Sequence, residues 1–308
     1  MSRKGKSALL QRVEYAAYRF VAARVARASD PAILRWGSRL GRVARRVLRR
    51  RDRLAMRNLQ IAFPQKSERE RRAILDACWI HFGREALVSI RAQNMTLEEI
   101  AESCPLVNAE LIDQALARGR GVILISAHYG GWEIAGLAIM SRYQKVRTVA
   151  RRLDNALLER DLARLRSQTG VEVVDRRRAA RPLMKGLAEN RIVVLLPDQA
   201  VLPREGLLAP FMGRKAWTTP APAKMAIRTD STIVFAFCIP DGARHRLEFE
   251  EAIRVDELSE AERTDEALTT RINDVISRRI ADRPELWLWM HDRWKATAPG
   301  ESERVNGA

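Results

Sequence analysis

Apolar residues recur at three- and four-residue spacing over residues 8–28, which predicts an amphipathic helix. Its apolar side is formed by Leu9, Val13, Ala17, Phe20 and Val21. Asp30 and Pro31 form a helix start signal, and a second amphipathic pattern runs on to about residue 53. Its apolar side is formed by Ile33, Trp36, Leu40, Val43 and Val47. Arginines occupy the other sides of both helices, a pattern typical of a membrane-surface element. The alternative interpretation is a solvated, charged face.

From residue 106 onward, short apolar runs alternate with helical periods. The predicted strands are 122–126, 146–150, 171–174, 192–196, 232–239 and 246–251. One helix is predicted before this region, at 66–94. Within the region, the predicted helices are 108–118, one from about 132, 155–168, 180–189, 218–229 and 260–282. The Pro- and Gly-rich stretch 197–216 is predicted to be a loop. Strands that alternate with helices in this way indicate an α/β fold, with a mostly parallel central sheet flanked by helices.

The positive charge is concentrated at the start of the chain. The 308 residues carry a formal net charge of +17, and residues 1–60 hold 17 basic residues against three acidic ones. This segment therefore carries +14, which points to an anionic surface such as a membrane or a nucleic acid. We divide the chain into a basic helical membrane-surface segment (1–60), an α/β domain (61–296) and a polar tail (297–308).

Composition excludes several classes of protein. A hydrophobic content of 46% is too high for a disordered chain. Three distant cysteines without a CxxC pair argue against a disulfide framework or a cysteine-based zinc site. Residues 8–28 contain too many charges for a secretory signal. The least charged run, 121–141, has a polar cluster at its middle, which favours a strand, a turn and a helix over a membrane span.

That polar cluster, His-Tyr-Gly-Gly-Trp-Glu, directly follows the predicted strand 122–126, where ligands of parallel α/β folds are found. The spacing of His128 and Glu133 allows a strand–turn–helix to bring the carboxylate onto the imidazole. Such a contact fixes the tautomer and raises the basicity of the second ring nitrogen. The amides of Gly130 and Gly131 would then bind an anion or a developing oxyanion. The alternative is structural, with a turn histidine and a helix N-terminal acid.

The remaining histidines give no metal signature, because no carboxylate is spaced to join them. We expect His81 to be a satisfied core or interface residue and His245, beside the turn at Asp241, to be exposed. His291 is either structural or part of the site. GxGxxG and Walker A sequences are absent, so no nucleotide cofactor is predicted.

The cluster resembles the HxxxxD/E motif of glycerolipid acyltransferases. With Trp before Glu, it is similar to the bacterial lipid A late acyltransferase family of the lauroyl/myristoyl type, and the resemblance extends over residues 10–296. Further segments match in order: Asn58-Leu59 with Phe63-Pro64, RRLDNALL (151–158), Pro197-Asp198-Gln199 with Gly206, Pro210-Phe211 and Gly213, AWTTP (216–220) and WMHDRWK (289–295). Two features depart from the family pattern: residues 8–28 are too charged for the usual hydrophobic anchor, and Gly131 replaces the usual asparagine.

This resemblance implies an O-acyltransferase of lipid A and lipopolysaccharide biosynthesis, without a cofactor. His128 would be the general base for an acceptor hydroxyl, and Glu133 would orient it. The acceptor oxygen would attack the thioester of an acyl carrier protein or coenzyme A directly. The enzyme would work at the cytoplasmic face of the bacterial inner membrane, as a peripheral or monotopic protein on an anionic membrane surface.

The resemblance also implies substrate-binding residues beside Gly130 and Gly131. An arginine of the 155–169 helix is functional in the family, and Arg166 matches best, with Arg164 as the second choice. Its guanidinium would hold a phosphate or stabilise the oxyanion. Asp198 is expected at the same sheet edge, where it would position Arg166 or the acceptor. The structural alternatives are a solvated helix face for Arg166 and a turn residue for Asp198.

Other functions stay open at this point. Within the same class, the acceptor could be a lysophospholipid, phosphatidylinositol mannoside or another glycolipid. In a different class, the high pI invites a nucleic-acid-binding protein, although the chain lacks a known binding module. A catalytically inactive membrane scaffold with the same fold is a third alternative.

Overall fold

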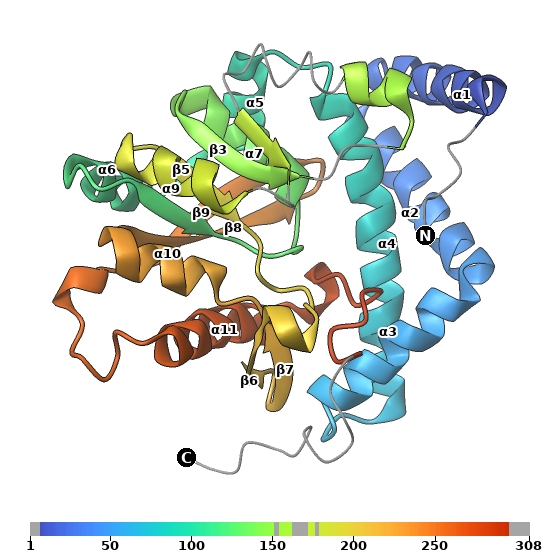
Figure 1. Ribbon diagram of the computed structural model, residues 1–308. Coiled ribbons are helices and arrows are strands. Elements are labelled where there is room, and N and C mark those ends of the chain that lie inside the picture. Colours follow the sequence, from blue (N-terminus) through green and yellow to red (C-terminus); the bar gives the residue numbers. More distant parts are fainter. Residues whose placement is uncertain (1–6, 151–153, 162–171, 176–178, 296–308) are drawn as a thin grey trace.

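The computed structural model describes residues 7–150, 154–161, 172–175 and 179–295, and it is built around a seven-stranded sheet (Figure 1). The strand order is β1-β9-β8-β2-β5-β3-β4, and only β8 and β9 pair antiparallel. The strands are β1 (Leu106–Val107), β2 (Val122–Ile125), β3 (Val146–Ala150), β4 (Glu172–Asp175), β5 (Ile192–Leu195), β8 (Thr232–Asp241) and β9 (Arg244–Ile253). The prediction of an α/β fold with a mostly parallel sheet is therefore confirmed.

Strand β2 is apolar throughout because both of its faces are covered. Val122 and Leu124 belong to one hydrophobic cluster, and Ile123 and Ile125 belong to another. Successive side chains of a strand point to opposite faces, so the two clusters lie on the two sides of the sheet. The helices that contribute to the first cluster include α5 (Leu97–Ser103), α6 (Glu110–Ala117) and α7 (Trp132–Arg142). Those that contribute to the second include α9 (Ala180–Ala188), α10 (Ala221–Thr229) and α11 (Asp265–Asp282).

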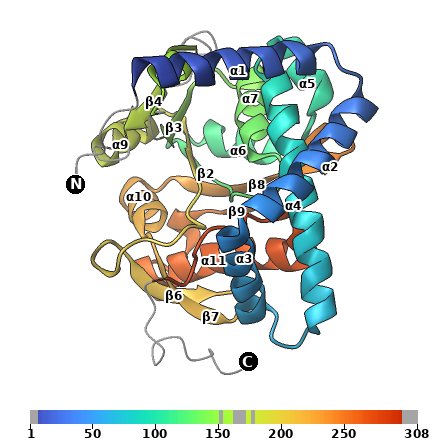
Figure 2. The ribbon, with the colours of Figure 1, turned by 90° about the vertical axis from the view of Figure 1, so that its right-hand side faces the viewer.

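The first four helices come before α5 and the sheet; the first lies across the top of the molecule, and the other three run along one side of it (Figures 1 and 2). They are α1 (Ala8–Ala26), α2 (Asp30–Val47), α3 (Arg49–Ala62) and α4 (Glu68–Ala92). The second amphipathic pattern of the sequence is thus split into two helices, which meet at Leu48, a residue with non-helical dihedral angles. Within the described ranges, the structure contains no helix that is both long and apolar enough to cross a membrane.

Helices α2 and α4 approach each other at three glycines. A Cβ atom on Gly41 would lie 2.0 Å from the backbone oxygen of Trp79, and one on Gly83 would lie 2.2 Å from the backbone oxygen of Gly37. No side chain fits at such distances, so the two backbones are in direct contact. The basic segment is therefore joined to the body of the protein at α2.

The loop predicted at 197–216 is only partly a loop. Its second half forms a small antiparallel sheet of β6 (Leu207–Phe211) and β7 (Arg214–Thr218). The two strands are connected by Met212 and Gly213, both with positive φ, as a tight hairpin turn requires. The prediction was wrong here because Pro and Gly dominate the composition of the segment and conceal two five-residue strands.

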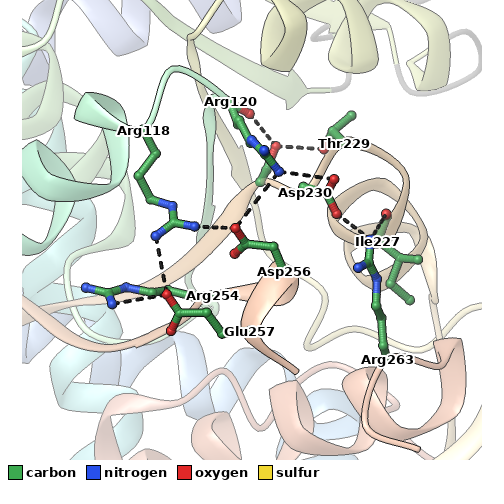
Figure 3. Close-up of polar contacts among 10 residues, drawn as sticks. Arg118, Arg120, Ile227, Thr229, Asp230, Arg254, Asp256, Glu257 and Arg263 are labelled. Atoms are coloured by element: carbon green, nitrogen blue, oxygen red, sulfur yellow. Dashed lines mark hydrogen bonds and ion pairs between the residues drawn. The ribbon is translucent and has the colours of Figure 1, made fainter. Parts of the chain in front are cut away.

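A network of ion pairs lies near the amino-terminal ends of β2 and β8 (Figure 3). Arg120, just before β2, pairs with Asp230, just before β8, at 3.1 Å. Arg118 pairs with Asp256 and, at 3.4 Å, with Glu257. Each pair is partly exposed and therefore contributes little stability on its own. The network connects segments at the end of the sheet opposite to the residues analysed next.

We expect Gly41→Ala to destabilise the protein, because its Cβ atom would force α2 away from α4. Overpacking of this kind typically lowers the free energy of unfolding by about 1–3 kcal/mol. Gly136→Ala in α7 is the matched control, since no atom lies within 4 Å of its Cβ position. There the better helix propensity of alanine should raise stability by up to about 1 kcal/mol. Denaturant unfolding of both variants tests the prediction, and equal stabilities would contradict it.

Candidate active site

His128 lies where β2 ends, next to the end of β5. The two strands pair in parallel, and the chain after β5 carries Asp198 to the same edge of the sheet. The backbone amide of His128 donates to Asp198 Oδ2 at 3.0 Å, and His128 Nδ1 lies 2.9 Å from Asp198 Oδ1. The carboxylate therefore holds the histidine at two points, as the expectation that both residues share one sheet edge requires.

Asp198 is almost completely buried, with 1% of its side chain exposed. Burial by itself raises the pKa of a carboxyl group, but the charge and hydrogen bonds of His128, together with the indole of Trp287, hold the pKa of Asp198 below its usual value. Trp287 Nε1 donates to Asp198 Oδ2 at 2.9 Å. Asp198 is thus an ionised carboxylate with a fixed orientation.

The pairing determines how His128 can act. An ionised carboxylate at Nδ1 selects the tautomer with its proton on that nitrogen, which leaves the lone pair on Nε2. Burial lowers the pKa of His128, but the Asp198 charge and hydrogen bond, with a smaller effect of Glu133, outweigh it and raise the pKa above 6.5. The His128 side chain is 23% exposed. It is therefore a reachable base, more basic than an ordinary histidine.

Glu133 occupies a different position from the one that its spacing suggested. We expected its carboxylate at a ring nitrogen of His128, but the structure places Asp198 at Nδ1. Glu133 is exposed in the first turn of α7, and its Oε1 accepts a hydrogen bond from Trp132 Nε1 at 3.1 Å. Trp132 directly precedes Glu133 in the chain, and the centre of its ring lies 5.6 Å from the centre of the His128 ring. Glu133 thus acts on His128 through its charge.

Gly130 and Gly131 form the turn between His128 and α7, and their amides are already occupied. Gly130 N donates to Leu286 O at 2.8 Å, and Gly131 N donates to Cys238 O at 3.0 Å. Our expectation that these amides bind an anion is therefore corrected, because the backbone oxygens of Leu286 and Cys238 already accept their hydrogen bonds. Gly130 has φ of +58°, and a Cβ atom there would lie 1.8 Å from Cys238 O. These glycines shape the turn.

A buried acid–base cluster supports this turn from behind. Glu85 on α4 accepts hydrogen bonds from His245 Nε2 at 3.0 and 3.1 Å, and His81 Nδ1 lies 3.8 Å from Glu85. His245 is only 4% exposed, so the prediction of an exposed residue was wrong. His245 packs against Gly131, where an added Cβ atom would lie only 2.6 Å from His245 Cδ2. A glycine in this turn leaves the space that His245 fills.

The C-terminal segment, residues 284–295, closes the site on another side. Leu288 N donates to His128 O at 3.0 Å, so the segment is bonded directly to the turn that carries His128. His291 Nε2 accepts from Ala200 N at 3.2 Å, and burial lowers the pKa of His291 to about 4. His291 is thus a neutral acceptor that holds the chain at Ala200, two residues after Asp198. Sequence reasoning did not predict that Trp287 binds Asp198; only its membership in an aromatic-rich segment hinted at a buried role.

The same segment contains a buried cation. Arg293 is fully buried, donates to Trp217 O at 2.8 Å and lies 4.3 Å over the ring of Phe211. It therefore fastens the β6–β7 hairpin beside the site. Arg166 and Arg164 lie outside the described residues. Within the residues that the structure describes, no three His, Cys, Asp or Glu side chains gather as metal ligands would.

Known proteins resemble the chain over most of its length. A family model described as bacterial lipid A biosynthesis acyltransferase matches residues 3–296. The chain is 25% identical over 264 residues to the lipid A biosynthesis myristoyltransferase of Escherichia coli (strain K12), covering 86% of this chain and 81% of that protein. It is 27% identical over 279 residues to the lipid A biosynthesis lauroyltransferase of the same organism, covering 89% of both.

A third relative carries a different acceptor in its name. The chain is 28% identical over 230 residues to the phosphatidylinositol mannoside acyltransferase of Mycolicibacterium smegmatis (strain ATCC 700084 / mc(2)155), covering 73% of this chain and 72% of that protein. The names of all three relatives describe acyl transfer. The family resemblance drawn from the sequence motifs is thereby confirmed.

The geometry predicts which acid controls His128. Asp198→Asn should lower the pKa of His128, because it removes the largest of the influences that raise it, and Glu133→Gln should lower it by less. Titration of the histidine ring protons by NMR in the wild type and in each variant measures both shifts. A larger shift in Glu133→Gln than in Asp198→Asn would contradict the assignment.

Proposed function

The chain belongs to the bacterial lipid A biosynthesis acyltransferase family and is an acyltransferase; on that premise, we propose that it transfers a fatty acyl chain from a thioester donor to a hydroxyl of a lipid A precursor or similar glycolipid. The observation that carries the proposal is the His128–Asp198 pair, 2.9 Å apart at the carboxyl edge of the sheet. A single base of this kind suits direct attack by an acceptor hydroxyl.

The proposed reaction needs one proton carrier. His128 Nε2 takes the proton of the acceptor hydroxyl as its oxygen forms a bond to the thioester carbon. The tetrahedral adduct then collapses, the carbon–sulfur bond breaks, and the imidazolium returns the proton to the departing thiolate. Asp198 holds the ring in place and stabilises the imidazolium between the two steps. The products are an acyl ester and a free thiol, and no covalent acyl-enzyme forms.

Other groups assist in this scheme. Glu133 adds negative charge near His128 and so favours the imidazolium form. Arg166 stays a prediction for holding a phosphate or stabilising the oxyanion, because a guanidinium fork suits both tasks. The amides of Gly130 and Gly131 donate to protein carbonyls, so the donor for the oxyanion comes from another group.

We place the reaction at the cytoplasmic face of the inner membrane, on an anionic surface. Two features support this placement. Helix α1 exposes Leu9, Val13 and Phe20 at 73%, 57% and 68%, a row of apolar residues on one side of a basic helix. Residues 1–60 also hold 17 basic residues against three acidic ones. A cationic surface suits both anionic lipid and an acidic acyl carrier protein as donor, with coenzyme A as the alternative donor.

Phosphatidylinositol mannoside is the second candidate acceptor. The 28% identity to a mycobacterial enzyme named for it favours this alternative within the same reaction class. Mass spectrometry of lipids from cells with and without the protein separates the two, since a loss of one acyl mass identifies the acceptor.

We expect His128→Ala to lower kcat by at least about 100-fold, the usual contribution of a general base. The variant should also melt at a lower temperature, because buried Asp198 loses the partner of its charge, so activity is measured at a temperature at which it is folded. For the wild type, kcat/KM should rise with pH through a pKa above 6.5, because only neutral His128 can accept the proton. Asp198→Asn should move this rise to lower pH, and Glu133→Gln should lower kcat more than it changes substrate binding. Thioester consumption with a glycolipid acceptor measures all four. Activity above a tenth of wild type in His128→Ala would reject the base.

Binding to membranes tests the placement separately. Val13→Asp with Phe20→Asp should weaken binding of the full chain to anionic vesicles, because both side chains are exposed on α1 and a carboxylate there resists burial in the interface. Binding should also fall as salt rises. Vesicle flotation measures both effects. Arg12→Gln with Arg19→Gln, at exposed positions of the same helix, is the control, because it changes the charge by the same two units and keeps the apolar side chains. Equal binding of the wild type and the double aspartate variant would reject membrane contact by α1.

A further inference from the structure

A cavity of about 870 Å³ opens at the junction of α2, α3 and α4, and neither His128 nor any other residue of the candidate active site lines it. Its most frequent lining residue is arginine. The five arginines are Arg42, Arg45, Arg46, Arg49 and Arg53. We call this cavity the arginine pocket.

Two carboxylates in the pocket are already paired with the same arginine. Arg45 Nε donates to Asp52 at 2.9 Å, and Arg45 Nη1 forms an ion pair with Asp76. Asp52 also accepts from Trp79 Nε1 at 2.9 Å, so its place in the wall is fixed. The two acids offset two of five guanidinium charges, and the pocket keeps a net charge of +3.

Three other arginines of the pocket are open to a ligand. Arg42, Arg46 and Arg53 are exposed, and none of them makes an ion pair with an acid in the described part of the chain. Like charges gathered around one cavity repel each other, and a bound anion relieves that repulsion. Guanidinium groups bind phosphate oxygens in pairs, which makes phosphate the best-matched anion.

An apolar stripe on α2 shows what carries the phosphate. Trp36, Leu40, Val43 and Val47 are 39%, 44%, 52% and 72% exposed and recur at helical spacing. Arg42 and Arg46 precede Val43 and Val47 by one residue each, which is a rotation of about 100° on the helix. The same helix therefore presents a row of cations beside a row of apolar side chains, and a soluble phosphate would leave the apolar row in water.

We propose that the arginine pocket binds the phosphate monoester headgroup of a membrane lipid whose acyl chains lie along the apolar stripe of α2. A monoester fits better than a diester, because it carries about −1.5 to −2 charges and three terminal oxygens for several guanidinium groups. The pocket adds a specific lipid contact to the diffuse attraction of the basic segment. This inference rests on the membrane placement proposed above.

The test compares two triple variants of the full chain that lose the same charge. Arg42→Gln, Arg46→Gln and Arg53→Gln remove three of the four pocket arginines for which no ion pair is found in the described part of the chain, and keep Arg49, whose Nε donates to Arg46 O at 3.4 Å. The control replaces three arginines that are exposed on α2 and α3 but do not line it: Arg35→Gln, Arg39→Gln and Arg50→Gln. Flotation uses phosphatidylcholine vesicles with phosphatidic acid or phosphatidylglycerol, matched in surface charge, at about 0.15 M salt, where diffuse attraction is screened beyond about 8 Å.

We expect wild type to bind phosphatidic acid vesicles about fivefold or more tightly than phosphatidylglycerol vesicles, since the monoester offers three terminal oxygens and more negative charge to the guanidinium groups, whereas the diester offers two oxygens and a single charge. The control should keep this ratio, and the pocket variant should lose it. Loss of the ratio in both triples, or in neither, would overturn the proposal, as would tighter binding of wild type to duplex DNA than to phosphatidic acid vesicles.

A third variant distinguishes the loss of guanidinium groups from misfolding and from the loss of charge. Arg42→Lys, Arg46→Lys and Arg53→Lys keep the net charge but remove the guanidinium forks, so the ratio should fall while binding to phosphatidylglycerol stays as in wild type. An unchanged ratio would overturn the assignment of a fork-bound phosphate. No acyl substrate is present in these assays. Failure here leaves the His128 chemistry standing, and full activity of His128→Ala would reject that chemistry whatever the vesicles show.

Discussion

The site depends on one buried carboxylate, that of Asp198. It accepts from the backbone and ring of His128 and from the indole of Trp287, so it joins the ends of β2 and β5 to the C-terminal segment. A charge buried this deeply is tolerated only when such partners surround it. Its ionised state in turn sets the tautomer and the raised pKa of His128. Removing one partner would leave a buried charge or an unpaired donor, which explains why three distant segments must fold together before a base exists.

Helix α4 links this site to the basic segment. Gly83 contacts α2, Phe82 packs at 5.6 Å on the Trp132 ring, and Glu85 binds His245 behind the Gly130–Gly131 turn. Phe82 and Glu85 lie on one side of the helix, because residues three apart share a face, and Gly83 lies on another side, rotated by about 100° from Phe82. Helix α2 and the turn that carries His128 are thus both packed against the same helix, which joins the proposed membrane contact to the proposed base. This arrangement would hold the acceptor hydroxyl and His128 at a constant depth relative to the membrane.

Charge and chemistry are separated in the molecule. The excess arginines lie on α2 and α3, around the arginine pocket and beside an exposed apolar stripe, whereas His128 works in a nearly neutral body. Arg293 is the exception, a cation buried at the site, where burial lowers its pKa to about 10 and the Phe211 ring and backbone oxygens surround it. Arg293 therefore supports the fold, whereas the arginines of the arginine pocket are the ones proposed to meet anions at the surface.

The sequence by itself determined the α/β class, the buried strand β2, the turn with His128 and the uneven charge, because each depends on local pattern or composition. It also predicted that Asp198 lies at the same edge of the sheet as His128, because the carboxyl ends of neighbouring parallel strands meet at one edge. Only the tertiary structure decided that Asp198, 70 residues away, and not Glu133 holds Nδ1. Local spacing favoured Glu133, but the glycine turn leaves it exposed on α7. The burial of His245 against Glu85 and the hairpin β6–β7 were likewise decided by long-range packing, which no short window of sequence contains.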